Sequence, residues 1–183
     1  MTSRPGILSR LLGLLRPSTG PTRRRRPSFR GSGGARPRDA SPGQSGGTAT
    51  LEITPPAMDG LRIAYAPKIN GAPDAGEVVW TWVPFQEHDG RGKDRPVLVI
   101  GRRDAEYAYA VKLTSKAHDG DREFLPIGSG PWDSRGRPSW VDIDQVYLVH
   151  RYGLRREAAA LDRERFARVA AVLHRRYGWT VDA

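Results

Sequence analysis

The sequence contains no cysteine, which excludes disulfide bonds, thiol catalysis and zinc sites built on cysteine. Its four histidines are scattered along the chain, and no two of them have the spacing of metal ligands. We therefore expect neither a metal site nor a cofactor. Long hydrophobic runs are missing as well, since none approaches the ~20 residues that a membrane-spanning helix needs. Any chemistry must rest on the other polar side chains.

Acidic residues are nearly missing from the first 50 residues. This segment holds ten of the thirty basic residues, all of them arginine, and a single acid, Asp39, which gives a net charge of +9. The rest of the chain has twenty basic and nineteen acidic residues and a net charge of only +1. The basic character therefore belongs to the tail, which could bind an anionic partner such as RNA or lipid. The charge of the whole chain is a poor argument for nucleic-acid binding by the fold itself.

The same segment has little to bury. Residues 1–50 are rich in Arg, Gly, Pro and Ser, and residues 31–47 contain no large apolar side chain. Such a composition cannot offset the entropy lost on ordering, so we predict a disordered tail. Residues 7–15 are an exception, because their apolar side chains could form a short amphipathic helix on a membrane surface or a partner.

Strand patterns recur from residue 76 onward. Residues 76–83, 93–100, 107–115 and 139–146 are rich in β-branched, aromatic and aliphatic side chains, and Gly-, Pro- and Asp-containing turns separate them. This spacing predicts a mainly β domain over residues 76–183, folded as a small antiparallel barrel. Residues 51–75 are predicted to form a lead-in arm with one short strand.

The last element is predicted to be a helix. Asp162 is a plausible N-cap, and Gly178 is a stop signal. Between them the apolar residues follow helical spacing on one face: Phe166, Val169, Ala170, Leu173 and Tyr177. Residues 157–160 are compatible with an additional turn of helix before it.

Arg95 and Pro96 stand where a polar loop becomes an apolar run. Pro96 cannot donate a ladder hydrogen bond, so it is expected at the first residue or the edge of a strand. Arg95 is thereby held at the mouth of a rigid element, a position that suits a residue in contact with substrate.

Taken in order, these segments resemble the MazF/PemK family of toxin endoribonucleases. The resemblance rests on Gly-Glu-Val-Val-Trp at residues 76–80, Arg-Pro-Val-Leu-Val at 95–99, Thr114-Ser115 and Asp-Gln-Val at 144–146, and covers roughly residues 76–178. It implies an SH3-like barrel in a cytoplasmic homodimer. It also implies metal-independent cleavage of single-stranded mRNA at specific short sequences, with neutralisation by a cognate acidic antitoxin.

The candidate catalytic residues are Arg95, Thr114 and Asp144. A guanidinium can stabilise a phosphorane through bidentate hydrogen bonds, and less readily donate a proton, although the resemblance assigns this arginine an acid/base role. The alternative is a surface ion pair with Asp94. The Thr114 hydroxyl could contact a phosphate oxygen or the attacking 2′-OH, or it could simply cap a turn.

Asp144 could orient Arg95, accept a base edge or satisfy the backbone of a turn. In Kid-like members of the family the residue two positions earlier is basic, whereas here it is Asp142. Alternation along a strand predicts that both carboxylates point to one face. The same rule predicts that Lys112 faces solvent.

The candidate RNA-binding residues lie on the loops and strand ends. Arg91 and Lys93 belong to the polar loop of residues 84–93, where His88 is a weaker candidate for a general base. The other candidates are phosphate contacts at Ser115 and Lys116, a stacking platform at Trp132 and a polar contact at Gln145.

Two other classes of function remain open at this point. A gyrase-poisoning toxin similar to CcdB would share the architecture without nuclease chemistry. A catalytically silent adaptor would bind RNA or anionic lipid through its Arg-rich tail.

Overall fold

The computed structural model describes residues 40–182, except residues 68–71 and 88. The predicted disordered tail, as far as residue 39, and the predicted amphipathic segment at residues 7–15 lie outside the described residues. Within the described part the elements are, in chain order, η1 (Gly46–Thr48), β1 (Leu51–Ile53), β2 (Arg62–Ala64), β3 (Glu77–Pro84), β4 (Gly92–Arg102), β5 (Tyr107–Thr114), β6 (Phe124–Gly128), β7 (Ser139–His150), β8 (Arg155–Ala160), α1 (Arg163–Tyr177) and β9 (Thr180–Asp182).

Residues 40–50, which the sequence assigned to the tail, pack against the sheet. Thr50 is buried, and its hydroxyl oxygen lies 2.5 Å from that of Thr81 on β3. The Pro42 carbonyl accepts a hydrogen bond of 2.9 Å from the Trp82 amide. Gly43 lies so close that an added Cβ would fall 2.2 Å from the Thr81 hydroxyl, which only glycine permits. The packed part of the described chain therefore begins before residue 51.

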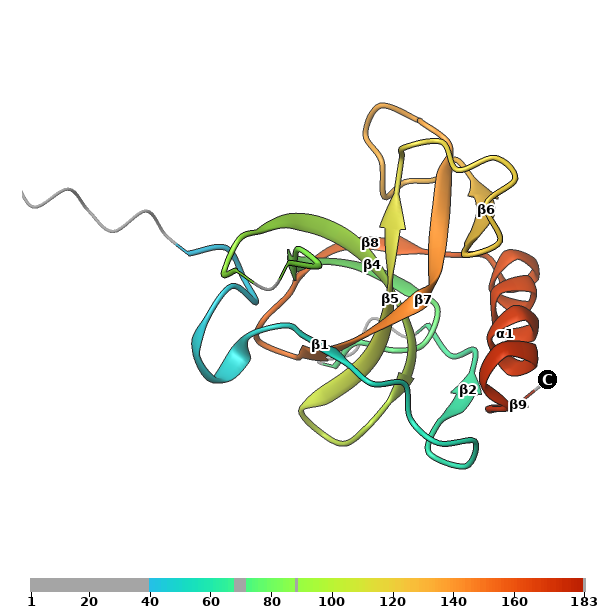
Figure 1. The fold of residues 1–183 in the computed structure, drawn as a ribbon, viewed down its shortest axis with the longest axis horizontal. Coiled ribbons are helices and arrows are strands. Elements are labelled where there is room, and N and C mark those ends of the chain that lie inside the picture. Colours follow the sequence, from blue (N-terminus) through green and yellow to red (C-terminus); the bar gives the residue numbers. More distant parts are fainter. Residues whose placement is uncertain (1–39, 68–71, 88, 183) are drawn as a thin grey trace, which may run out of the picture. The chain divides into compact units, whose positions relative to one another are not determined.

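The main sheet is antiparallel and has the strand order β1-β7-β5-β4-β3-β8, with β6 also paired to β7. Figure 1 shows that it is strongly curved, with α1 beside β7. A second, parallel pair joins β2 to β9. The prediction of a mainly β antiparallel fold with a C-terminal helix is confirmed. The hydrogen-bonded path ends at β1 and β8, so the described strands form an open barrel rather than a closed one.

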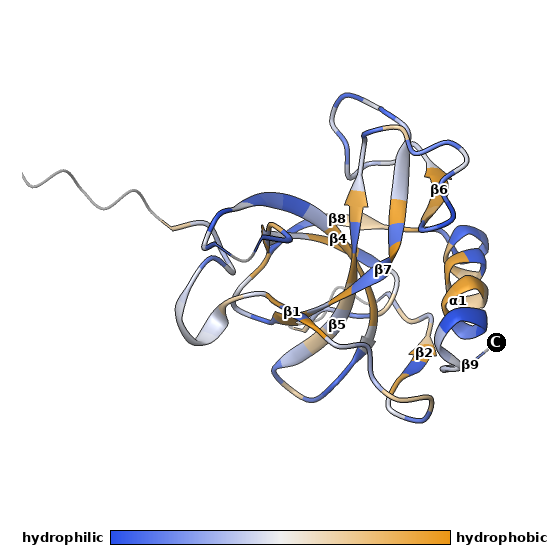
Figure 2. Cartoon of the chain, viewed as in Figure 1, coloured by the Kyte–Doolittle hydropathy of each residue, from blue (hydrophilic) through white to orange (hydrophobic). Residues whose placement is uncertain are grey.

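The central strands are buried on both faces because the sheet curls over itself. On β4, Leu98 and Ile100 pack into a large cluster with α1, whereas Val97 and Val99 pack into a second cluster with residues of β3, β5 and β7. This explains the unbroken apolar run at residues 97–100. Figure 2 shows how β4 changes from hydrophilic at its start to hydrophobic in its centre. The start of β4 is consequently free to line a polar site.

The C-terminal helix begins and ends where the sequence indicates. Asp162 accepts a hydrogen bond of 2.9 Å from the Arg165 amide, and Gly178 adopts a left-handed conformation with φ of 76°. The predicted apolar face is buried from Phe166 to Leu173. Within the described residues, no helix is both long and apolar enough to cross a membrane.

Residues 157–160 do not extend this helix, so that part of the prediction is wrong. They belong to β8, which pairs with β3 through Glu77–Ala160 and Val78–Ala159. The register shifts next to these pairs, and Ala158 has a positive φ of 52° at this irregularity. The hydrogen bonds gained by pairing with β3 outweigh the helical propensity of the alanines.

Candidate active site

A polar cleft of about 570 Å³ opens at the start of β4. Its walls come from the end of β3, the loop that follows it, β4, β5, the β5–β6 loop and the middle of β7. The residues that line it are Val83, Pro84, Phe85, Gln86, Glu87, Arg91, Arg95, Lys112, Thr114, Lys116, His118, Glu123, Phe124, Asp142, Asp144 and Gln145. We call it the first cleft. It contains all three predicted catalytic residues.

A second cleft of about 330 Å³ lies next to the first. Its lining includes Lys93, Ser115 and Trp132. Arg95, Thr114 and Lys116 line both clefts, so these residues form the ridge between them. The strand ends thus bring together the predicted phosphate-binding groups.

Arg95 is half-buried and lies opposite Thr81 in the β3–β4 register. Pairing of β4 with β5 begins two residues later, at Val97–Lys112, which is why Pro96 is tolerated within β4. Asp94 does not pair with Arg95, because its carboxylate accepts a hydrogen bond of 3.0 Å from Arg155. Among the described residues, no carboxylate forms an ion pair with the Arg95 guanidinium, which stays available to a ligand.

The Thr114 hydroxyl caps a turn. Its oxygen accepts a hydrogen bond of 3.2 Å from the Lys116 amide. This is the alternative role that the sequence allowed, and it leaves the hydroxyl proton free to donate towards the cleft. Lys116 is exposed at the same point. A hydroxyl donor and an ammonium group therefore border the cleft beside Arg95.

A bulge in β7 changes the predicted surroundings of Lys112 and Asp142. Val111 pairs with Val146 and Leu113 with Val141, so residues 142–145 stand opposite Lys112 alone. Asp142 Oδ1 accepts the amides of Asp144 and Gln145, at 2.9 and 3.3 Å. The prediction that Lys112 faces solvent is wrong, because the bulge breaks the alternation. Asp142 and Asp144, which were predicted to point to one face, both line the first cleft, but Asp142 is buried and Asp144 is exposed.

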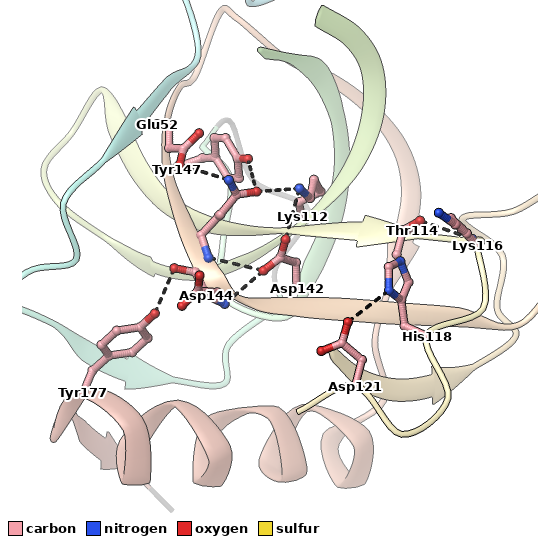
Figure 3. Close-up of polar contacts among 11 residues, drawn as sticks. Glu52, Lys112, Thr114, Lys116, His118, Asp121, Asp142, Asp144, Tyr147 and Tyr177 are labelled. Atoms are coloured by element: carbon pink, nitrogen blue, oxygen red, sulfur yellow. Dashed lines mark hydrogen bonds and ion pairs between the residues drawn. The ribbon is translucent and has the colours of Figure 1, made fainter. Parts of the chain in front are cut away.

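Lys112 instead forms part of the cleft floor (Figure 3). Its Nζ lies 3.0 Å from Asp142 Oδ2 and donates to Gln145 Oε1 at 2.5 Å. The side chain of Lys112 is only 17% exposed and that of Asp142 only 5%. The second carboxylate near the phosphate-binding ridge is therefore neutralised by a cation from the neighbouring strand.

Gln145 is held within this network. Its Oε1 also accepts a hydrogen bond of 3.0 Å from the Tyr147 hydroxyl, and its Nε2 donates to Glu52 Oε1 at 3.1 Å. Burial raises the pKa of Tyr147, and the Glu52 and Asp142 carboxylates raise it further, so the phenol stays a proton donor. Gln145 is 7% exposed, and the structure does not support its predicted role as a direct RNA contact. Gln145 instead holds the side chains of Lys112, Glu52 and Tyr147 in place at the floor of the first cleft.

Asp144 is the exposed carboxylate of the bulge. It forms an ion pair with the Arg176 guanidinium on α1, and its carbonyl accepts a hydrogen bond of 3.1 Å from the Tyr177 hydroxyl. Burial raises the pKa of Tyr177. Asp144 lines the first cleft, but its carboxylate is joined to the helix rather than to Arg95. The predicted Arg95–Asp144 contact is not formed.

The loop between β3 and β4 carries two predicted phosphate contacts. Arg91 is exposed and pairs with Asp89 at 2.6 Å, and it borders the first cleft. Two hydrogen bonds from Arg91 lower the pKa of Asp89. The bond from the Arg91 amide has the larger effect, and the bond from the side chain has the smaller one. Lys93 is exposed beside the second cleft. His88 lies outside the described residues.

Trp132 is buried at 2% exposure, so the prediction that it stacks on a base is wrong. Its Nε1 donates to Ser139 Oγ at 3.1 Å. Gly130 lies against the ring, where an added Cβ would fall 2.1 Å from it. The loop folds over Trp132 and buries it. Neither the position of Trp132 in a loop nor the nearby glycine residues indicate this burial in the sequence.

Sequence reasoning also missed His118 and Asp121, which are drawn in Figure 3. His118 lines the first cleft, and its Nδ1 lies 3.4 Å from Asp121 Oδ2. The signal that could have found the pair is Asp119-Gly120, a turn sequence that places the flanking residues side by side. Among the described residues, no group of three or more His, Asp or Glu side chains could hold a metal ion.

The fold is mainly β, and its polar cleft joins a free guanidinium, a hydroxyl and an ammonium group, an arrangement suited to a phosphate-bearing ligand. Residues 74–176 match the family described as PemK-like, MazF-like toxin of type II toxin-antitoxin system. The match spans more than half of the chain, and the chain belongs to this family. The family predicted from the sequence is thereby confirmed.

Solved structures of MazF proteins are also similar to the chain. MazF (Form-I) from Deinococcus radiodurans is 23% identical, with a TM-score of 0.45 over 58% of this chain and 97% of that chain. MazE-MazF (Form-II) from the same organism is 21% identical, with a TM-score of 0.43 over 60% of this chain and 98% of that chain. No curated protein matches the chain.

Proposed function

We propose that this toxin is an endoribonuclease that cleaves single-stranded mRNA without a metal ion. The ribose 2′-OH attacks the adjacent phosphorus, the bond to the 5′-oxygen breaks, and a 2′,3′-cyclic phosphate remains. The cleft must then stabilise the charge that develops on the phosphorane oxygens. The location of the substrate makes the cytoplasm the site of action.

Arg95 carries the charge-stabilising role. The supporting observation is that Arg95 lines both clefts, while the nearest acid in sequence, Asp94, pairs with Arg155 instead. Bidentate hydrogen bonds from arginine match the geometry of a phosphate group. Thr114 donates its hydroxyl proton to the same group, and Lys116 adds a positive charge.

The remaining predicted contacts act on either side of this ridge. Arg91 binds RNA from the first cleft, and Lys93 and Ser115 bind it from the second. Asp144 contributes as a hydrogen-bond acceptor for RNA at the rim of the first cleft, where Arg176 holds its carboxylate. An acidic antitoxin segment lying across the clefts would meet the same cations. The toxin acts as a homodimer in this proposal.

The test is cleavage of unpaired RNA by the purified protein in EDTA, followed by analysis of the new ends. We expect 2′,3′-cyclic phosphate and 5′-hydroxyl ends, and a rate that falls roughly 100- to 1,000-fold in Arg95→Ala, as for the loss of other transition-state donors. Arg168→Ala is the matched control, because Arg168 is exposed on α1 away from both clefts.

Full cleavage by Arg95→Ala would contradict the role of Arg95. Intact RNA with wild-type protein, together with DNA breaks trapped in gyrase complexes, would instead favour a gyrase poison. RNA binding without cleavage that depends on residues 1–50 would favour the adaptor.

A further inference from the structure

The β5–β6 loop places an imidazole and a carboxylate side by side at the wall of the first cleft. The Asp121 amide donates to the His118 carbonyl at 3.1 Å, which closes a turn over Asp119 and Gly120. Gly120 has a φ of 79°, a conformation that favours glycine. The turn brings His118 Nδ1 to 3.4 Å from Asp121 Oδ2. The pair is a product of the local turn geometry.

The imidazole is held from a second side. Its ring stacks on Phe124 of β6, with 3.5 Å between the ring centroids and 12° between their planes. The side chain of His118 is only 20% exposed. Asp121 is also anchored, because its Oδ1 accepts a hydrogen bond of 3.0 Å from the Glu123 amide. A loop histidine that was merely solvated would need none of these contacts.

The orientation of the ring leaves one nitrogen for the cleft. Nδ1 is directed at Asp121, and Figure 3 shows the other ring nitrogen on the side of Thr114 and Lys116. His118, Thr114 and Arg95 line the same cleft. A carboxylate beside Nδ1 favours the tautomer that carries the proton there, so Nε2 is an acceptor.

The groups proposed for catalysis so far lack a proton acceptor. Arg95 is a poor base, Thr114 has no basic atom at neutral pH, and Asp144 is paired with Arg176. We propose that His118 is the general base of the toxin and that Asp121 is its positioning residue. This inference rests on the endoribonuclease function proposed above.

In the proposed step, His118 Nε2 takes the proton of the ribose 2′-OH while the 2′-oxygen forms its bond to phosphorus. The bond between phosphorus and the 5′-oxygen breaks, and the leaving oxygen takes a proton from water. The imidazolium then returns its proton to solvent, so no net proton is consumed. Asp121 stabilises the imidazolium while it exists.

Several charged groups lie beside the imidazole or line the first cleft with it. Asp121 and Glu123 contribute negative charge from the loop, and Lys116 contributes positive charge from the end of β5. Arg95 and the neutralised Asp142 line the same cleft. Histidine changes charge between about pH 5 and 8, and only its neutral form accepts a proton. Acidification should therefore lower the cleavage rate.

The experiment compares pH–rate profiles for cleavage of unpaired RNA by wild type, His118→Ala and Asp121→Asn. We expect the wild-type rate to fall on acidification, and His118→Ala to lose roughly 100- to 10,000-fold in rate together with this acidic limb. Added imidazole should restore part of the rate of His118→Ala. Asp121→Asn should lose less, and its matched control, Asp119→Asn in the same turn, should behave as wild type.

A binding measurement separates catalysis from folding. Affinity for a 2′-O-methyl RNA, which cannot react, should be unchanged in His118→Ala, as should its thermal unfolding. Equal rates and equal pH profiles in wild type and His118→Ala would overturn the role of His118 while leaving the endoribonuclease intact. The role of His118 would also be overturned if His88→Ala, and not His118→Ala, lost the fall in cleavage rate on acidification. A wild-type protein that cleaves no RNA would overturn the proposed function itself.

Discussion

Lys112 of β5 and Asp142 of β7 form an ion pair beneath the first cleft, with 3.0 Å between Nζ and Oδ2. The pair is possible only because the bulge in β7 turns Asp142 towards β5. Asp142 uses its other oxygen to hold the bulge through two backbone amides. Charge neutralisation and strand geometry thus depend on one carboxylate.

We expect Lys112→Met to destabilise the fold by about 3 kcal/mol, because it leaves a buried carboxylate without its cation. Urea unfolding measures this change. The double variant Lys112→Met, Asp142→Asn should recover much of the loss, since asparagine keeps an oxygen for the two amides and carries no charge. Equal losses in the single and double variants would show that the pair is not coupled.

Trp132 gives a prediction that separates core from ligand contact. Trp132→Phe removes the hydrogen bond to Ser139 and part of the buried ring, and should cost about 1–3 kcal/mol in the free energy of unfolding. The affinity for unreactive RNA should not change. Reduced affinity with unchanged stability would return Trp132 to the role of a stacking platform.

Thr81 ties residues 40–50 to the sheet. Its hydroxyl donates to the Gly153 carbonyl at 2.6 Å and lies 2.5 Å from that of Thr50. Thr81→Val has nearly the same shape but leaves these buried groups unpaired, at a cost of about 1–3 kcal/mol. Thr81→Ser keeps the hydroxyl and should lose less. Limited proteolysis should then cut residues 40–50 faster in the valine variant only.

The sequence predicts the main strands and the helix well, because hydrophobic patterns and caps are local signals. Asp162 and Gly178 mark the ends of α1 where the structure has them. The short strands β6, β8 and β9 escaped. For β8 and β9 the reason is that they pair with β3 and β2, which are distant in the sequence. The alanines of β8 illustrate this, since no nearby residue in the sequence indicates that they pair with β3.

The candidate site was predicted in part. Arg95 and Thr114 were placed at strand ends that meet in one cleft, as expected for antiparallel neighbours. Alternation failed at Lys112 and Asp142, because a bulge shifts the phase of one strand and leaves no mark in its own sequence. His118 was missed because its partner comes from a turn, and loop histidines carry no periodic signal.

Because Arg95 forms part of the wall of both clefts, an inhibitor has two independent routes to it. Each hollow, at about 570 and 330 Å³, is within the size range of small-molecule pockets, about 300–1,000 Å³. A compound that fills either one would touch Arg95. Resistance through substitutions in one cleft would therefore leave the toxin open to a blocker that binds in the other.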